Sequence, residues 1–290
     1  DTSRMIPTTS PIMPAFLLCV SLVCVTTLAW AQVDGQQTKE SPPKTGQNIS
    51  AAALRAVPPD SNGWVAMDAL EAAAASPDRA LAALAALRAS QVVHAVDAFD
   101  LEEQEIARAT LRSYRTAWLA IASNENRWVD IRVYALDVAT RLQALLATFG
   151  ETAPAPLWQP FLSSSDPEMR VAAITLVPES VDLSKALREF LIGEQPEEVA
   201  LSAAQRLCGP LREELSDTPK LDAPALERLQ ALARATSLPI IARTQLAPCL
   251  LVDGSVQSRR TLAILLQKSP PALRRHLSNL IKRQASAKKE

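Results

Sequence analysis

Residues 166–177 read DPEMRVAAITLV, and this stretch decides the fold class that the sequence predicts. Asp166 can cap a helix with its carboxylate, and Pro167 suits the first helical position, where an amide hydrogen has no partner inside the helix. Alanine, leucine and other apolar residues follow without a glycine. The stretch therefore predicts a helix that runs to Val177.

A weak repeat of this pattern extends to both sides of the stretch. Two helix starts join an aspartate to a nearby arginine: Asp130 with Arg132, and Asp166 with Arg170. Two later helices begin at Pro196 and Pro239 without that pair. Repeats of this kind are units that stack on their neighbours in order to bury their apolar faces.

Residues 166–173, DPEMRVAA, resemble the D-P-x-x-R-x-x-A start of a second helix in the HEAT-repeat family. The resemblance spans residues 126–252. It implies an all-α, right-handed α-solenoid of stacked antiparallel helix pairs, as in armadillo-like helical proteins. It also implies that Asp130, Arg132, Asp166 and Arg170 tie neighbouring repeats together and are structural. Because the spacing of the units is uneven, a generic helical bundle is the alternative.

The composition also favours an all-α chain. Among 290 residues there are only seven glycines and 4% aromatic residues, and alanine and leucine supply most of the 48% that is hydrophobic. These two residues favour helices, whereas strands favour branched and aromatic side chains. Helical spacing and capping residues predict further helices at 77–89, 183–192, 196–208, 222–235, 256–267 and 270–283, and one from Pro239. The apolar stripes that contain Trp118 and Trp128 are expected in the core.

Residues 12–31 carry no charge and end in Ala29-Trp30-Ala31, which has the small residues that signal peptidase requires. We expect a signal peptide at 1–31, cleavage after Ala31, and a periplasmic or secreted protein. A membrane anchor formed by an uncleaved helix is the alternative, because twenty apolar residues can just span a bilayer. The remaining predicted regions are a disordered linker at 32–48, an N-terminal helical region at 49–125, the HEAT-like repeats at 126–252, a basic helical pair at 253–285 and a tail at 286–290.

Export leaves Cys208 and Cys249 in the mature chain as a candidate disulfide, since exported proteins meet an oxidising environment. The two cysteines fall at nearly equivalent places after Pro196 and Pro239, and equivalent places in adjacent repeats lie side by side. Two buried free thiols are the alternative.

Positive charge is concentrated in the last two predicted helices. Residues 255–290 hold nine basic residues and one acid, so this segment carries +8 within a chain of net charge −1. A solvated surface explains such a face, and contact with an anionic partner is the alternative. The candidate contacts are Arg259, Arg260, Lys268, Arg274, Arg275, Lys282 and Arg283.

Motifs for catalysis or for a metal are not apparent in the sequence. The two histidines, His94 and His276, are far apart, and His94 has the apolar neighbours of a core histidine. A Ser-His-Asp arrangement assembled in space stays open. Glutamate clusters at 102–105, 197–198 and 213–214 suit the first turns of helices or polar helix faces. Trp158, in a proline-rich stretch, is either core or an exposed platform.

The preferred hypothesis is an exported, non-enzymatic helical-repeat protein that acts as a protein-binding scaffold or adaptor in the cell envelope. We expect no cofactor, no metal and no nucleic acid. The first alternative is a polyanion or membrane-surface binder that uses the basic C-terminal helices, and so contacts an anionic envelope component. A helical hydrolase with a carboxylate pair is the third hypothesis.

Overall fold

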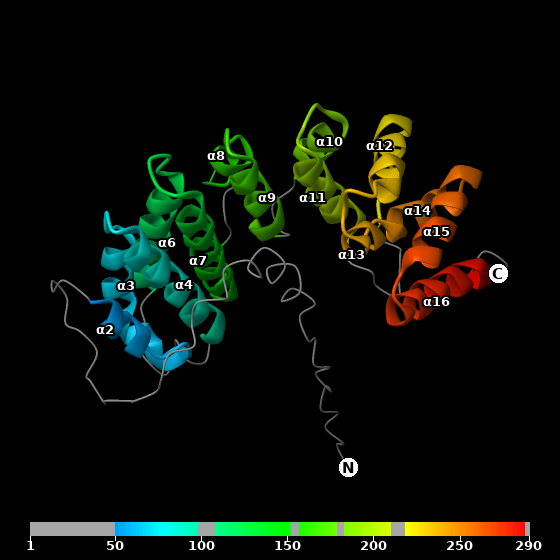
Figure 1. The fold of residues 1–290 in the computed structure, drawn as a ribbon. Helices are drawn as coiled ribbons and strands as arrows, with labels where there is room; N and C mark the ends of the chain where they lie inside the picture. Colours follow the sequence, from blue (N-terminus) through cyan, green and yellow to red (C-terminus); the bar gives the residue numbers. More distant parts are fainter. Residues whose placement is uncertain (1–49, 98–107, 152–156, 179–182, 210–217, 288–290) are drawn as a thin grey trace, which may run out of the picture. The chain divides into compact units, whose positions relative to one another are not determined.

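The computed structural model describes residues 50–97, 108–151, 157–178, 183–209 and 218–287 (Figure 1). All of these residues belong to one compact unit, Pro42–Glu290. Every regular element in them is a helix, so the prediction of an all-α chain is confirmed for the described part. The predicted signal peptide at 1–31 and linker at 32–48 lie outside the described residues.

The α-helices are labelled in Figure 1. The described helices are α2 (Ala51–Ala56), the 3-10 helix η2 (Ser61–Ala66), α3 (Met67–Ala74), α4 (Arg79–Ala95), α6 (Arg108–Ser123), α7 (Val129–Thr148), α8 (Gln159–Leu162), α9 (Pro167–Leu176), α10 (Ser184–Ile192), α11 (Glu197–Cys208), α12 (Ala223–Arg234), α13 (Ile240–Thr244), α14 (Ala247–Asp253), α15 (Val256–Lys268) and α16 (Pro271–Ala287).

Neighbouring helices pack in pairs. Helix α3 packs on α4, α6 on α7, α8 on α9, and α10 on α11. The second helices of these pairs also pack on one another in chain order, α4 on α7, α7 on α9, and α9 on α11. The first helices of successive pairs also pack on one another, including α10 on α12 and α12 on α15. The two helices of each pair therefore pack on one another, and each pair also packs on the next pair.

One apolar cluster runs through all these interfaces, from Leu54 in α2 to Leu280 in α16. Many of its members are alanines, which allow helix axes to approach closely, and leucines fill the space between them. Trp118 in α6 and Trp158 before α8 are fully buried, so the core interpretation of Trp158 is the correct one.

Several predicted helix ends are confirmed by their capping contacts. Asp166 accepts a hydrogen bond from the Glu168 amide, and Asp222 accepts one from the Ala225 amide. Gly209 and Gly254 follow α11 and α14 with φ values of +70° and +62°, which glycine adopts without steric cost. These local signals could be recognised because each acts within a single turn.

Three predicted helices have wrong bounds. The helix predicted at 270–283 continues to Ala287 as α16. Helix α4 begins at Arg79, because Asp78 rather than Ser76 accepts the free amides of Ala80 and Leu81, and it continues to Ala95. The helix predicted from Pro239 is divided into α13 and α14. Pro248 lacks the amide hydrogen that a continuous helix would have donated to the Thr244 carbonyl, so the helix restarts before it.

Two side chains that were expected in the core are exposed. His94 lies on the outer side of α4, with 54% of its side chain accessible. Trp128 is the residue before α7 and is 37% exposed, with the Arg79 guanidinium 5.9 Å from its ring centroid. The neighbours of His94 along the chain are apolar, whereas Trp128 lies between Arg127 and Val129, and both side chains face away from the core.

Candidate functional site

The predicted Asp–Arg residues lie where one helix pair meets the next. Arg132, on α7, is buried, and its Nη1 is 3.9 Å from Oδ2 of Asp166. Its Nε donates to the carbonyl oxygen of Ala122 at the end of α6. A single guanidinium thus connects both helices of its own pair to the residue that caps α9.

Asp130 and Arg170 occupy related positions with different partners. Asp130 accepts from Arg79 at 3.2 Å, which connects the start of α7 to the start of α4. Arg170 donates to the carbonyl oxygens of Ser164 and Ser165, in the turn before its own helix. Of the four residues, Asp130, Arg132 and Asp166 therefore make contacts between pairs, and Arg170 stabilises the turn between α8 and α9.

Two further arginines make the same kind of contact and were not singled out from the sequence. Arg141, late in α7, donates to the carbonyl oxygens of Val93 and Val96 at the end of α4, at 3.1 and 2.9 Å. Arg206, late in α11, donates to those of Thr175 and Val177 at the end of α9, at 3.3 and 2.7 Å. The last carbonyls of a helix lack partners within it, so each arginine satisfies the end of the preceding second helix.

The environment of Arg141 is partly apolar. Burial lowers the pKa of its guanidinium below the ordinary value, and the nearby carboxylates of Asp97 and Asp137 oppose that shift. The guanidinium stays charged, because arginine does not lose its proton in proteins. Hydrogen bonds from a charged donor to carbonyl oxygens are stronger than those from a neutral one.

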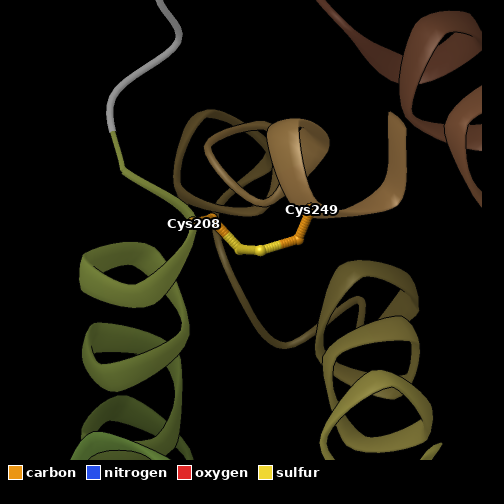
Figure 2. The surroundings of a disulfide bond; sticks show 2 residues. All are labelled: Cys208 and Cys249. Atoms are coloured by element: carbon orange, nitrogen blue, oxygen red, sulfur yellow. A yellow bond between two sulfur atoms is a disulfide. The ribbon is translucent and has the colours of Figure 1, made fainter. Parts of the chain in front are cut away.

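Cys208 and Cys249 are joined in a disulfide (Figure 2). Cys208 is the last residue of α11, and Cys249 lies in α14, with their Cα atoms 5.2 Å apart. Both residues are buried. Close by in sequence, Gln205 donates to the carbonyl oxygen of Ala242 in α13. The structure therefore joins these helices covalently where the earlier pairs are joined by arginines.

Weaker polar contacts continue the series toward the C-terminus. The Gln230 amide on α12 donates to the Ser258 hydroxyl on α15 at 3.0 Å, and both side chains are buried. Gln284 on α16 donates to the carbonyl oxygen of Leu251 on α14 at 2.7 Å. From α4 to α16, each helix pair is thus joined to the next by at least one polar or covalent contact in addition to apolar packing.

Ser90, His94 and Asp137 come together between α4 and α7. The Ser90 hydroxyl donates to Oδ2 of Asp137 at 2.5 Å, and His94 Nε2 lies 3.0 Å from Oδ1 of the same carboxylate. In a catalytic triad the imidazole lies between the serine and the aspartate. Here the aspartate lies between the other two, so this arrangement does not give Ser90 an imidazole that takes its proton.

A second polar cluster involves α3 and α6 and was also missed from the sequence. The Tyr114 hydroxyl donates to Asp68 at 2.7 Å, and the tyrosine ring makes an edge-to-face contact with Trp64. Burial, with a contribution from the Asp68 charge, raises the pKa of the neighbouring Glu71 carboxyl. An aspartate and a glutamate three residues apart on one helix are a weak sequence signal, because the same spacing is common on solvated helix faces.

Of the predicted glutamate clusters, the structure describes only Glu197 and Glu198. Both lie in the first turn of α11, as expected for acids that favour the positive end of a helix. Glu197 accepts a hydrogen bond from Ser237 at 2.8 Å. The clusters at 102–105 and 213–214 lie outside the described residues.

The predicted basic residues lie on α15 and α16. The described side chains among them are exposed: Arg259, Arg260, Lys268, Arg274, Arg275 and Lys282. Arg259 donates to the carbonyl oxygen of Gly254, and Arg274 donates to that of Ser269, so these two also stabilise turns. The side chain of Arg283 lies outside the described residues.

Comparison of the chain with protein-family models, with curated proteins and with solved structures finds no match. In the part of the chain that the structure describes, no helix combines the length and hydrophobicity of a membrane span. The same residues contain no group of three or more His, Cys, Asp or Glu side chains that could hold a metal ion. The fold and the contacts above therefore define the class of this protein only as far as an all-α chain of packed helix pairs.

Proposed function

We propose that this chain is an exported α-solenoid of the HEAT type, with a right-handed stack of antiparallel helix pairs, and that it binds another protein as a scaffold or adaptor in the cell envelope. The proposal includes no catalytic role. A stack of this kind offers binding surfaces along its length, and binding then requires no reactive side chain.

One observation carries the proposal: an arginine side chain joins successive pairs at three steps, and at two of them it satisfies the end of a helix in the preceding pair. Arg141 satisfies the end of α4, and Arg206 satisfies the end of α9. Arg132 reaches Asp166 between these two steps. In a generic bundle each helix packs around a common core, whereas contacts repeated between neighbours are typical of a repeat array.

The disulfide supports the proposed export. Disulfides persist in oxidising compartments and are rare in the cytosol. A cysteine pair that is buried and bonded between α11 and α14 is therefore consistent with a protein that folds after export.

The test is cross-linking of the tagged full chain in intact cells, followed by reconstitution of each captured complex from purified components. We expect at least one envelope protein that binds the purified chain saturably and with fixed stoichiometry. Failure of every captured protein to bind after purification, across several growth conditions, contradicts the proposal.

The exposed basic residues of α15 and α16 favour a second candidate function, binding of a polyanion or an anionic membrane surface. Such binding weakens as salt is added, because salt screens exposed charges. Retention on heparin or on anionic phospholipid vesicles that falls with salt supports this function. Retention that survives replacement of Arg260, Lys268 and Arg275 by glutamate contradicts it.

A further inference from the structure

Helix α15 carries a row of exposed side chains, four residues apart, in which apolar and basic residues alternate. The row winds slowly around the helix, because one turn takes about 3.6 residues. The row consists of Val256, Arg260, Ile264 and Lys268 and is called the α15 ridge here. Residues four apart lie on the same face of a helix, one turn above another. Val256 is 63% exposed and Ile264 is 36% exposed, so both apolar side chains are accessible to a ligand.

The opposite face of α15 is held in the core. Its buried residues are Ser258, Thr261, Leu262 and Leu265, and the helix packs on α12, α13, α14 and α16. The ridge is therefore presented by an anchored helix. A ligand that covers it gains contact area without moving the helix.

The basic residues of the ridge have no acidic partner among the described residues. No described carboxylate forms an ion pair with Arg260 or Lys268, and the sequence from 256 to 287 contains no aspartate or glutamate. Arg259, by comparison, is already engaged with the Gly254 carbonyl. The positive charge of the ridge is thus uncompensated, and an acidic partner complements it.

The alternation of residue types identifies the kind of acidic partner. A helix that enters a lipid surface keeps a continuous apolar face with its bases at the edges. Here Arg260 lies between Val256 and Ile264, so insertion of the ridge would bury the guanidinium among acyl chains. A polyanionic polymer pairs with the bases but leaves both apolar side chains in water.

The ligand must both cover the apolar side chains and pair with the bases. A partner helix meets these two requirements when the residues along one row, four apart, are alternately apolar and acidic. Rows of side chains spaced by four on one helix fit the grooves between such rows on another. The apolar residues of the partner then cover Val256 and Ile264, and its carboxylates reach Arg260 and Lys268. Paired charges at the edge of an apolar contact also fix its register.

We propose that the α15 ridge docks an acidic amphipathic helix of a partner protein. The proposal rests on the proposed function, because it assumes that the chain binds protein, and it adds where the partner binds and what chemistry it presents. It also states that the basic residues of the ridge bind a protein rather than an anionic membrane or polymer.

The experiment places a photoreactive phenylalanine derivative at Ile264 in the full chain and irradiates intact cells. The photoreactive derivative is also placed, in separate variants, at Val65 and at Ile192, in order to sample the rest of the surface. These two residues lie on other helices and are 68% and 53% exposed. Mass spectrometry then identifies the cross-linked segment. We expect an adduct at Ile264 to one protein segment that carries acidic and apolar residues at every fourth position.

Charge reversal tests the pairing within the same chain. Arg260→Glu is expected to reduce the Ile264 adduct by about tenfold or more, because it puts like charges opposite one another. The matched control is Arg188→Glu, which makes the same change at an exposed arginine on α10 and leaves the adduct unchanged. Thermal unfolding followed by circular dichroism establishes that both variants remain folded.

The outcomes separate the two proposals. Protein adducts at Val65 or Ile192 but not at Ile264 overturn the α15 ridge and leave protein binding in place. A lipid, a polysaccharide or a second copy of this chain at Ile264 also overturns it. No protein adduct at any of the three positions rejects both the ridge and the proposed function.

Discussion

Arg132 on α7 points its guanidinium at Asp166, the residue that caps α9, with 3.9 Å between Nη1 and Oδ2. The same aspartate accepts a hydrogen bond from the Glu168 amide. One carboxylate therefore caps α9 and also contacts the preceding helix pair through Arg132. Capping and stacking are therefore coupled at this position. Disruption of Asp166 is expected to affect both, whereas disruption of Arg132 affects the contact between pairs and the hydrogen bond to Ala122 within its own pair.

The coupling can be measured with a double-mutant cycle of Arg132→Ala and Asp166→Ala. We expect Arg132→Ala to cost about 2 kcal/mol, because it removes a charged hydrogen bond to a buried carbonyl. The coupling between the two residues is expected at about 1 kcal/mol in chemical denaturation. Additive effects of the two substitutions would contradict the contact. The control pair is Lys185 and Glu189, which is exposed and 4.0 Å apart, and for which we expect no measurable coupling.

The disulfide is expected to contribute strongly to stability. Its sequence separation is 41 residues, and the chain-entropy relation gives about 4 kcal/mol for a loop of that size. Replacing both Cys208 and Cys249 by alanine should lower the free energy of unfolding by up to that amount. The wild-type chain unfolded and refolded in reductant is the control and should match the variant. Equal stability of the oxidised and reduced chains would contradict a structural role.

Glu71 is expected to make stability depend on pH. Its pKa is raised by burial and by Asp68, so the folded state keeps this proton to a higher pH than the unfolded state. The free energy of unfolding therefore falls as pH rises through the interval between the two pKa values. Glu71→Gln cannot ionise and should be more stable than the wild type at about pH 8, with the difference shrinking below about pH 4.

The control for this prediction is Glu189→Gln, an exposed glutamate on α10. Its stability should follow the wild-type profile. Thermal melts of the three proteins over that pH range provide the measurement. A Glu71→Gln variant that is less stable than the wild type at high pH would show that the ionised carboxylate makes a favourable contact.

Much of the local structure could be predicted from capping residues. Asp166, Asp222 and Gly254 act within one turn of their own position, so their effect can be recognised without tertiary information. The choice between Ser76 and Asp78 could not be made in this way. Both residues can cap a helix. The predicted start at 77 places Ser76 at the cap, whereas in the structure the Ser76 hydroxyl accepts the Asp78 amide and Asp78 caps α4.

The contacts between pairs could be predicted only in part. The repeat of aspartate with arginine identified Arg132 and Asp166, but Arg141 and Arg206 depend on which helix end the stacking brings to them. His94 is a residue whose exposure could not be predicted from its neighbours along the chain. Apolar neighbours along the chain made it a core candidate, whereas its angular position on α4 places it outside, next to Asp137.

The central claim is that two pairs, α3 with α4 and α8 with α9, are each stabilised by the next pair through an arginine that satisfies the end of a helix. Native-state hydrogen exchange on Arg141→Met and Arg206→Met tests it most directly. Arg141→Met should speed exchange about tenfold at the end of α4, around Val93–Val96, and Arg206→Met should do so at the end of α9, around Thr175–Val177. Each variant should leave the helix end of the other protected. Faster exchange throughout the chain in both variants, or no change at either end, would contradict the claim.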